Sequence, residues 1–368
     1  MDTTEGLLAD LQWRGLVHQV TDTELGKILD KESLTAYIGF DPSADSLQLG
    51  NLAGILNLVR LQGAGHRPIA LAGGGTGLVG DPSGKSAERS LLTAEQLEAN
   101  LAGIRAQLGR FLDFDAGALL LDNGAWLWSL GLLEFLRDVG KHFTVNTMIA
   151  KESVRARLEE REQGISYTEF SYMLLQAYDF LQLYERHGCT LQAGGSDQWG
   201  NITMGVDLVR RSAGAAVYGL TTPLVTKADG TKYGKSVEGA VWLDPAKTSP
   251  YAMWQFLYNA EDAKVGEYLR FFTWRTKEEV AELDRATAEA PRRRQALRVL
   301  ANDVTALVHG AEAATRAEAA ADALFAGDFA ALDLDTLDVV LADAPGRRLP
   351  PEGLSVTEAL VVADLAAS

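Results

Sequence analysis

The sequence has 368 residues, which is enough for two domains or for one large α/β domain with an appendage. Hydrophobic residues make up 47% of it and charged residues 23%, as in soluble globular proteins, and no apolar run reaches the ~20 residues of a membrane-spanning helix. The formal net charge of −16 argues against a broad nucleic-acid-binding surface but leaves room for a local basic patch.

The few cysteine and histidine residues narrow the class further. The single cysteine, Cys189, excludes an intramolecular disulfide. The five histidines show no zinc-ligand spacing, and residues 1–5 lack the basic and apolar regions of a signal peptide. We therefore expect a cytoplasmic protein without a protein-held metal and without a membrane partner.

The first eighty residues predict alternating helices and strands. Amphipathic helices are expected within residues 1–35, a short apolar strand over 34–40, a helix over 52–64 and a buried strand over 68–72. A glycine-rich turn over 73–80 follows that strand. Strand, helix and strand in this order predict a Rossmann-like α/β fold with a doubly wound parallel sheet.

The rest of the chain predicts a continuation of this fold and then a helical region. Further helices are expected over 92–111, 130–143, 166–184 and 198–211, and further strands over 191–193 and 221–225. Residues 250–320 carry only helical patterns. We therefore expect an α/β domain over residues 1–245, an all-helical domain over 246–325 and a C-terminal tail over 326–368.

Two glycine-rich patterns resemble nucleotide-binding motifs, but their context does not support either one. Residues 75–80 match G-x-G-x-x-G after a strand, yet Asp81 and Pro82 stand where the following helix should begin. Residues 80–86 approach a P-loop, but the first glycine of that pattern would fall at Val79. Neither a dehydrogenase nor a P-loop enzyme is indicated.

One predicted helix places three polar side chains on a single face. Tyr172, Gln176 and Asp179 are spaced i, i+4 and i+7, so they share that face. A solvated helix surface would explain polar residues, but apolar residues of core type surround them. A phenol, an amide and a carboxylate together suit the ammonium group of an amino acid.

Four separated segments carry most of the charged and polar side chains that could bind a substrate or take part in catalysis. They are residues 37–51, 80–89, 167–179 with 192–201, and 227–236. In this order they resemble the tyrosyl-tRNA synthetases of class I, over roughly residues 5–325. The last segment is similar to the Lys-Met-Ser-Lys-Ser loop of that class, and agreement of all four by chance is implausible.

The resemblance implies a binding site for L-tyrosine. It assigns Asp81, Tyr172, Gln176 and Gln198 to the α-ammonium group. It also assigns Tyr37 and Asp179 to the phenolic hydroxyl. A buried carboxylate that accepts this O–H would refuse phenylalanine, and discrimination of about 10⁴–10⁵ is the magnitude already known for tyrosyl-tRNA synthetases.

The resemblance also implies that ATP, with Mg²⁺, lies over the glycine turns and the helix that begins near Gln48, whose N-terminal amides favour phosphate. It implies that Asp197 meets the ribose and that Asp41 sits near the reacting centre. Glycines that would lie beside the nucleotide are Gly39, Gly50 and Gly195. Cations that would neutralise the departing pyrophosphate are Lys85, Arg89, Lys232 and Lys235.

Three positions depart from the family pattern. Gln48 and Asn51 replace the two histidines of His-x-Gly-His, and Ser43 replaces the usual threonine but keeps its hydroxyl. As i and i+3 at a helix start, Gln48 and Asn51 should both point toward the phosphates. Each keeps an N–H donor, but neither can carry an imidazolium charge. Losing a donor tuned to the transition state costs about 2.7–4 kcal/mol, so we expect slower activation.

The implied function is ATP-dependent activation of L-tyrosine to tyrosyl-adenylate and pyrophosphate, with tRNA as the default acceptor. The acidic charge and the short C-terminal region favour an alternative, a paralogue that passes activated tyrosine to a nucleophile other than tRNA. If tRNA is the acceptor, the same two features predict that its binding is weakened. The substitutions at Gln48 and Asn51 favour a second alternative, a non-catalytic tyrosine-binding protein. Resemblance in residues 135–143 and around Tyr167 implies a homodimer.

Overall fold

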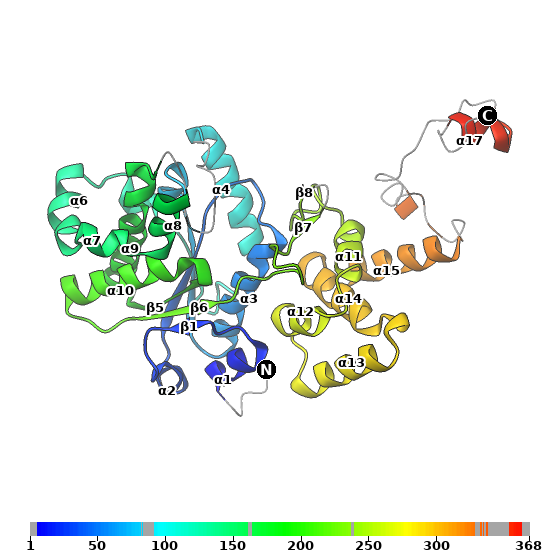
Figure 1. Ribbon diagram of the computed structural model, residues 1–368, viewed down its shortest axis with the longest axis horizontal. Helices are drawn as coiled ribbons and strands as arrows, with labels where there is room; N and C mark the ends of the chain where they lie inside the picture. The colour runs from blue at the N-terminus through cyan, green and yellow to red at the C-terminus, as the bar shows by residue number, and fades with distance from the viewer. Residues whose placement is uncertain are drawn as a thin grey trace.

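The structure is a computed structural model that describes residues 6–81, 83, 92–160, 164–236, 239–327, 332, 334, 336–337 and 353–362. A six-stranded sheet with the order β1-β6-β5-β2-β3-β4 forms its centre (Figure 1). The strands are β1 (Gln19–Val20), β2 (Thr35–Phe40), β3 (Arg67–Ala72), β4 (Leu119–Asp122), β5 (Cys189–Gly195) and β6 (Tyr218–Thr222).

Five of these strands are parallel, as predicted, and the exception lies at one edge. β6, β5, β2, β3 and β4 pair in parallel, whereas β1 pairs antiparallel with β6. The strands predicted over 34–40, 68–72 and 191–193 are present. The strand predicted over 221–225 is β6, which lies three residues earlier, over Tyr218–Thr222. Strands β1 and β4 were not predicted.

Helices cover both faces of the sheet (Figure 1), so its strands are apolar on both sides. Ile38 and Phe40 of β2 pack into one apolar cluster with residues of α3 (Leu49–Gly63), whereas Tyr37, which precedes Ile38 on the strand, packs into a second cluster with Met173 and Phe180 of α9 (Tyr167–His187). The helices are α1 (Leu7–Arg14), α2 (Leu25–Lys31), α3 (Leu49–Gly63), α4 (Ala94–Leu108), α5 (Gly124–Leu127), α6 (Leu132–Asp138), α7 (Val145–Ile149), α8 (Glu152–Glu160), α9 (Tyr167–His187) and α10 (Trp199–Ala213).

The helix predicted over 130–143 is shorter than expected. It ends as α6 at Asp138, and the chain continues in a 3-10 turn over Gly140–His142. α4 is also shorter than the predicted 92–111, because Thr93 caps its start by accepting the N–H of Gln96 at 3.2 Å.

Residues 250–326 form the predicted helical region, to the right of the sheet in Figure 1. A short hairpin of β7 (Lys235–Ser236) and β8 (Gly239–Ala240) precedes it. Its helices are α11 (Pro250–Tyr258), α12 (Val265–Phe272), α13 (Lys277–Glu289), α14 (Gln295–His309) and α15 (Ala311–Ala326), and α17 (Val356–Val362) follows. Within the described residues, no helix combines the length and apolar character that crossing a membrane requires.

Two buried arginines fasten the helical region to the α/β domain. Arg60 of α3 donates to the carbonyl of Phe271 at 2.9 Å, and Arg14 of α1 donates to the carbonyl of Thr273 at 3.2 Å. Carbonyl groups at the end of a helix lack partners within it, so the C-terminus of α12 is a natural acceptor for both guanidinium groups. Arg60 lies in the last turn of α3, so the end of this helix that faces away from the candidate site is fixed to the helical region.

Candidate active site

A cleft with a cavity of about 300 Å³ opens at the carboxyl ends of β2, β3, β5 and β6. The chain passes from β2 to β3 on one side and later returns to β5 on the other, so the cleft lies where the strand order reverses. Open α/β sheets bind ligands at this kind of position, because neighbouring loops leave in opposite directions there.

Most of the predicted site residues line this cleft. They are Tyr37, Gly39, Asp41, Gly50, Asn51, Asp81, Tyr172, Gln176, Asp179, Gly195, Asp197, Gln198 and Lys232. Ser43 and Gln48 do not line it. Lys85 and Arg89 lie outside the described residues, and only the backbone of Lys235 is described.

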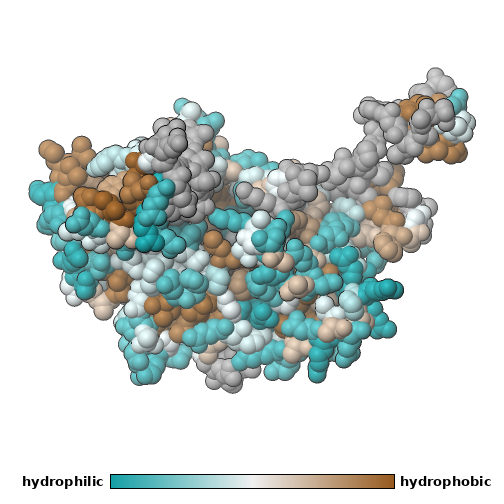
Figure 2. Space-filling view, viewed as in Figure 1, coloured by the Kyte–Doolittle hydropathy of each residue, from teal (hydrophilic) through white to brown (hydrophobic). Residues whose placement is uncertain are grey.

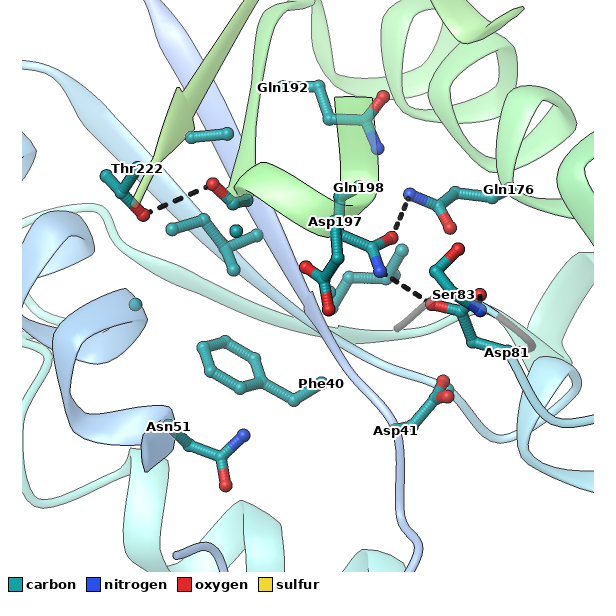
Figure 3. Close-up of a pocket in the computed structure, with 18 of the residues that line it drawn as sticks. Phe40, Asp41, Asn51, Asp81, Ser83, Gln176, Gln192, Asp197, Gln198 and Thr222 are labelled. Carbon is teal, nitrogen blue, oxygen red and sulfur yellow. Dashed lines mark hydrogen bonds between the residues drawn. The ribbon is translucent and has the colours of Figure 1, made fainter. Parts of the chain in front are cut away.

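One end of the cleft is polar and rich in oxygen acceptors (Figure 3). Gln198 donates to Asp81 Oδ2 at 2.6 Å, and Gln176 donates to Gln198 Oε1 at 3.1 Å. Asn201 in turn donates to Gln176 Oε1 at 3.0 Å. The backbone N–H of Ser83 donates to the other carboxylate oxygen of Asp81 at 2.9 Å. This network fixes a carboxylate and two amide groups in the arrangement that a small cation needs.

The buried end of the cleft contains a hydroxyl and a carboxylate. Asp179 is 2% exposed, and Tyr37 is 1% exposed with its hydroxyl hydrogen-bonded to no described residue. Burial raises the pKa of Tyr37 well above its usual value, and the charge of Asp179 adds to this effect. A buried polar group without a partner is costly, so this end suits a ligand hydroxyl that can both donate and accept.

Asp179 is held by two residues that the sequence analysis did not identify. Trp126 Nε1 donates to Asp179 Oδ1 at 2.7 Å, and Asn123 Nδ2 donates to Oδ2 at 2.9 Å. Burial raises the pKa of Asp179 to about 7, these two hydrogen bonds oppose that rise, and the nearby charges of Asp41 and Asp122 add to it. The signal available in the sequence was weak: an Asp-Asn-Gly turn directly after a short apolar run.

The start of α3 differs from the sequence prediction. Gln48 is an extended residue ahead of the helix, with φ −103° and ψ 162°, so it is not part of the first turn. Its N–H donates to Asn51 Oδ1 at 2.9 Å, and Figure 3 shows the amide nitrogen of Asn51 on the side of Phe40. Asn51 lines the cleft and Gln48 does not, because the i, i+3 relation of the two residues assumed a helical residue at position 48.

The loop that carries Lys232 is anchored at its base in the helical region. Tyr233 donates its N–H to the carbonyl of Val225 at 2.9 Å, and its ring stacks on Tyr268 with centroids 4.1 Å apart. The hydroxyl of Tyr268 donates to the carbonyl of Thr226 at 2.9 Å. These contacts hold the loop where Lys232 reaches the cleft. No group of three or more His, Cys, Asp or Glu residues in the described part of the chain could hold a metal ion.

This cleft, at the switch point of a doubly wound sheet and with a lysine loop over it, is that of a class I synthetase domain. Residues 29–326 match the family of tRNA synthetases class I (W and Y), and the chain belongs to that family.

Two relatives with high sequence identity are both tyrosine–tRNA ligases. The chain is 56% identical to a tyrosine–tRNA ligase of Roseiflexus castenholzii and 54% identical to one of Geobacillus stearothermophilus. Each match covers 98% of this chain and 87% of the relative. Among solved structures, a C-terminally truncated mitochondrial tyrosyl-tRNA synthetase of Aspergillus nidulans superposes with a TM-score of 0.78, at 29% identity, over 88% of this chain and 95% of that one.

Proposed function

We propose that this protein is a tyrosine-activating tRNA synthetase: it joins L-tyrosine to ATP, releases pyrophosphate and transfers the tyrosyl group to tRNA. The observation that carries the proposal is the pair formed by Tyr37 and Asp179 at the buried end of the cleft, which matches a phenol. The family membership and the relatives named as tyrosine–tRNA ligases support the same activity. The alternatives of another acceptor or of a non-catalytic binding protein have no support among these relatives.

In this proposal, tyrosine lies along the cleft with its phenol at the buried end. Its hydroxyl donates to the carboxylate of Asp179 and accepts from the hydroxyl of Tyr37. The ammonium group lies at the polar end, where Asp81 supplies the negative charge and Gln176 and Gln198 supply amide oxygens. Tyr172 completes this end, and its hydroxyl donates to Asp41 at 3.4 Å.

ATP occupies the remainder of the cleft, between the strand ends and α3. The ribose meets Asp197, and the phosphates lie near the N-terminus of α3, where the positive end of the helix dipole favours anions. Gly39 leaves room for the nucleotide, because a Cβ there would meet no atom within 4 Å and would project into open space. At Gly195 a Cβ would lie 2.7 Å from Asp197 Oδ1, so this glycine lets the carboxylate assigned to the ribose pack against the backbone. Gly50 also lines the cleft. Mg²⁺ would be held by the phosphates of ATP and would help to neutralise their charge, with Asp41 near the reacting centre.

The activation step needs charge stabilisation more than acid–base chemistry. A carboxylate oxygen of tyrosine attacks the α-phosphorus of ATP, a new P–O bond forms, and the bond to the β-phosphate breaks as pyrophosphate takes the electron pair. Positive groups on the leaving side stabilise the growing charge. We assign this work to Lys232, Lys235, Lys85 and Arg89, assisted by the amide of Asn51, whereas Gln48 and Ser43 lie outside the cleft lining. A tRNA ribose hydroxyl then attacks the acyl carbon and AMP leaves.

Tyrosine-dependent exchange between pyrophosphate and ATP tests the activation step, and charging of tyrosine tRNA tests the transfer step. We expect both activities with L-tyrosine and a loss of several orders of magnitude with L-phenylalanine. Equal exchange rates for the two amino acids would refute the assignment of the buried end to a phenol. Exchange without charging would limit the activity to adenylate formation.

We also propose that the protein works as a homodimer through the surface formed by α6 and α7. Figure 2 shows apolar side chains gathered at that end of the molecule, where Leu132 is 70% exposed and Leu133 is 81% exposed. Leu136, Val145 and Ile149 add to the same surface, and Tyr167 at the start of α9 is also exposed. Large exposed apolar patches mark association surfaces. Sedimentation of the parent chain and of Leu133→Glu tests it: a dimer that becomes a monomer supports the proposal.

A further inference from the structure

Asp122 lies outside the cleft lining but directly behind it. It is the last residue of β4 and pairs in register with Ala72, the last residue of β3. The turn Gly73–Gly75 follows Ala72, and Gly73 lines the cleft. Asp122 therefore stands beside the point where the chain leaves β3 and enters the site.

The carboxylate of Asp122 holds two loops together. Its Oδ1 accepts the N–H of Gly74 at 3.1 Å and the N–H of Gly124 at 2.8 Å. Its Oδ2 forms an ion pair with Arg105 of α4 at 2.6 Å, which fixes the plane of the carboxylate. One side chain thus joins the turn after β3 to the turn after β4.

The glycine at position 74 is fitted to this carboxylate. A Cβ atom on Gly74 would lie 2.1 Å from Asp122 Oδ1, far closer than two such atoms can approach. The turn therefore packs its backbone directly against the acid, and any side chain at this position would displace one of them. This steric match is independent of the hydrogen bonds.

Asn123, the next residue, extends the connection to the buried end of the cleft. Its Oδ1 accepts the N–H of Gly75 at 2.7 Å, and its Nδ2 donates to Thr76 Oγ1 at 2.9 Å and to Asp179 Oδ2 at 2.9 Å. A shift of the turn that Asp122 holds would therefore move the group that orients Asp179.

We propose that Asp122 is a positioning residue for tyrosine recognition: it sets the turn Gly73–Gly75 and the backbone at Asn123, and through Asn123 it orients the carboxylate of Asp179. Asp122 touches no substrate. The inference rests on the proposed function, because it assigns the phenol to Asp179.

The test compares kcat/KM for tyrosine with kcat/KM for phenylalanine in pyrophosphate exchange. This ratio does not depend on the fraction of active protein, so a general loss of folded enzyme leaves it unchanged. We expect Asp122→Ala to lower the ratio about tenfold, because both backbone N–H groups lose their acceptor. Asp122→Asn keeps an oxygen at Oδ1 and should stay within about threefold of the parent. An unchanged ratio in Asp122→Ala, or an equal fall in Asp122→Asn, would overturn the proposal.

Asp303 offers a matched control. It forms an ion pair with Arg275 in the helical region, and its side chain is 26% exposed against 25% for Asp122. Asp303→Ala removes the same charge and should leave the ratio unchanged, whereas a similar fall there would count against a specific role for Asp122.

Gly74→Ala carries the test if Asp122→Ala does not fold. We expect it to lower the ratio in the parent, and an unchanged ratio would contradict the proposal. Where both variants fold, adding Gly74→Ala to Asp122→Ala should lower the ratio less than it does in the parent, because the clashing atom is gone. A parent enzyme that does not prefer tyrosine would instead refute the proposed function itself.

Discussion

At the scale of single residues, the site depends on the buried carboxylate of Asp179. Its surroundings contain some features that favour the protonated form and others that favour the ionised form. Burial favours the protonated form of Asp179, whereas hydrogen bonds from Asn123 and Trp126 favour the ionised form, and the balance leaves its pKa at about 7. A phenol that donates to this group adds a third stabilising hydrogen bond. Recognition therefore depends as much on the two residues that hold Asp179 as on the acid.

Replacing Asp179 by alanine should lower the activity with tyrosine selectively. We expect kcat/KM for tyrosine in pyrophosphate exchange to fall at least a hundredfold, because the phenol loses a charged acceptor inside a buried site. The value for phenylalanine should change much less, since that substrate makes no such bond. A comparable fall for both amino acids would indicate a folding defect, and thermal unfolding of the variant serves as the control.

The raised pKa of Asp179 predicts that kcat/KM for tyrosine depends on pH. The ionised carboxylate accepts a hydrogen bond from the phenolic O–H, and the ionised fraction grows as the pH rises through about 7. Because kcat/KM reports the free enzyme, its value for tyrosine should rise with pH across this range. Asp179→Asn has no proton to lose and should give a flat profile. A rise near pH 7 that persists in Asp179→Asn would assign the titration to another group.

At the scale of elements, α3 links the phosphate end of the cleft to the helical region. Its first turn is capped by Asn51, which leaves that side chain with an amide nitrogen to offer the phosphates. The backbone just before it pairs with the segment after the lysine loop: the N–H of Leu49 donates to the carbonyl of Val241, and the N–H of Leu243 donates to the carbonyl of Leu47, both at 2.8 Å. The start of α3 and the loop that carries Lys232 therefore form one unit.

Restoring histidine at both altered positions tests how far this end limits the rate. We expect Gln48→His with Asn51→His to raise the rate of tyrosyl-adenylate formation about tenfold, because imidazole can donate and carry charge. Tyrosine affinity should be nearly unchanged, since these residues lie away from the amino-acid end. Asn51→His alone removes the oxygen that accepts the N–H of Gln48 and should lower the free energy of unfolding by about 0.5–1.5 kcal/mol. Single-turnover kinetics measure the rate, and a double variant that is no faster contradicts the prediction.

The elements that the sequence predicted well are those with strong local patterns. β2, β3 and α9 follow from apolar runs and helical spacing, and the face shared by Tyr172, Gln176 and Asp179 does line the cleft. β4 and the residues after it were missed for a physical reason. The bond from Trp126 to Asp179 joins residues 53 positions apart, and it exists only because β4 packs beside β3. Local sequence patterns do not predict such long-range contacts, and they did not predict the extended backbone at Gln48 either.

At the scale of the whole molecule, the α/β domain and the helical region are held together by buried charge as well as by apolar contact. Arg60 is fully buried, and burial lowers its pKa to about 9, so it remains charged at neutral pH. Its guanidinium donates to the carbonyls of Phe271 and Thr273 at the end of α12, and Arg14 also donates to Thr273. The stability of the helical region should therefore depend strongly on Arg60, which supplies the bond to Phe271.

Arg60→Met keeps much of the side-chain volume but removes the donor to the carbonyl of Phe271, whereas Arg14 still donates to the carbonyl of Thr273. We expect the unfolding free energy to fall by about 1–3 kcal/mol, because a buried acceptor left unpaired costs about that much. Arg105→Met is the control: its side chain is 45% exposed and forms a surface ion pair, so its loss should cost about 0–1 kcal/mol. Urea unfolding of both variants measures the difference, and equal losses would contradict the role given to Arg60.

The net charge of −16 bears on the transfer step, since tRNA is itself a polyanion. Binding must rely on local cations, of which Lys141 and Arg155 are exposed on the helices beside the cleft-bearing sheet. Because each phosphate contact releases counterions, KM for tRNA should rise steeply with salt, whereas pyrophosphate exchange without tRNA should hardly respond.

Arg155→Glu tests whether Arg155 makes such a contact. Arg155 is 62% exposed and has Glu159 of its own helix at 4.0 Å, and Lys27 is a matched control at 69% exposure beside Glu24. We expect Arg155→Glu to raise KM for tRNA several-fold and to lower the slope of log KM against log salt by about one, with exchange unchanged. Lys27→Glu changes the net charge equally but should leave the slope as it was. Equal effects of the two substitutions would mean that only the overall charge matters, and that Arg155 makes no direct contact with a phosphate.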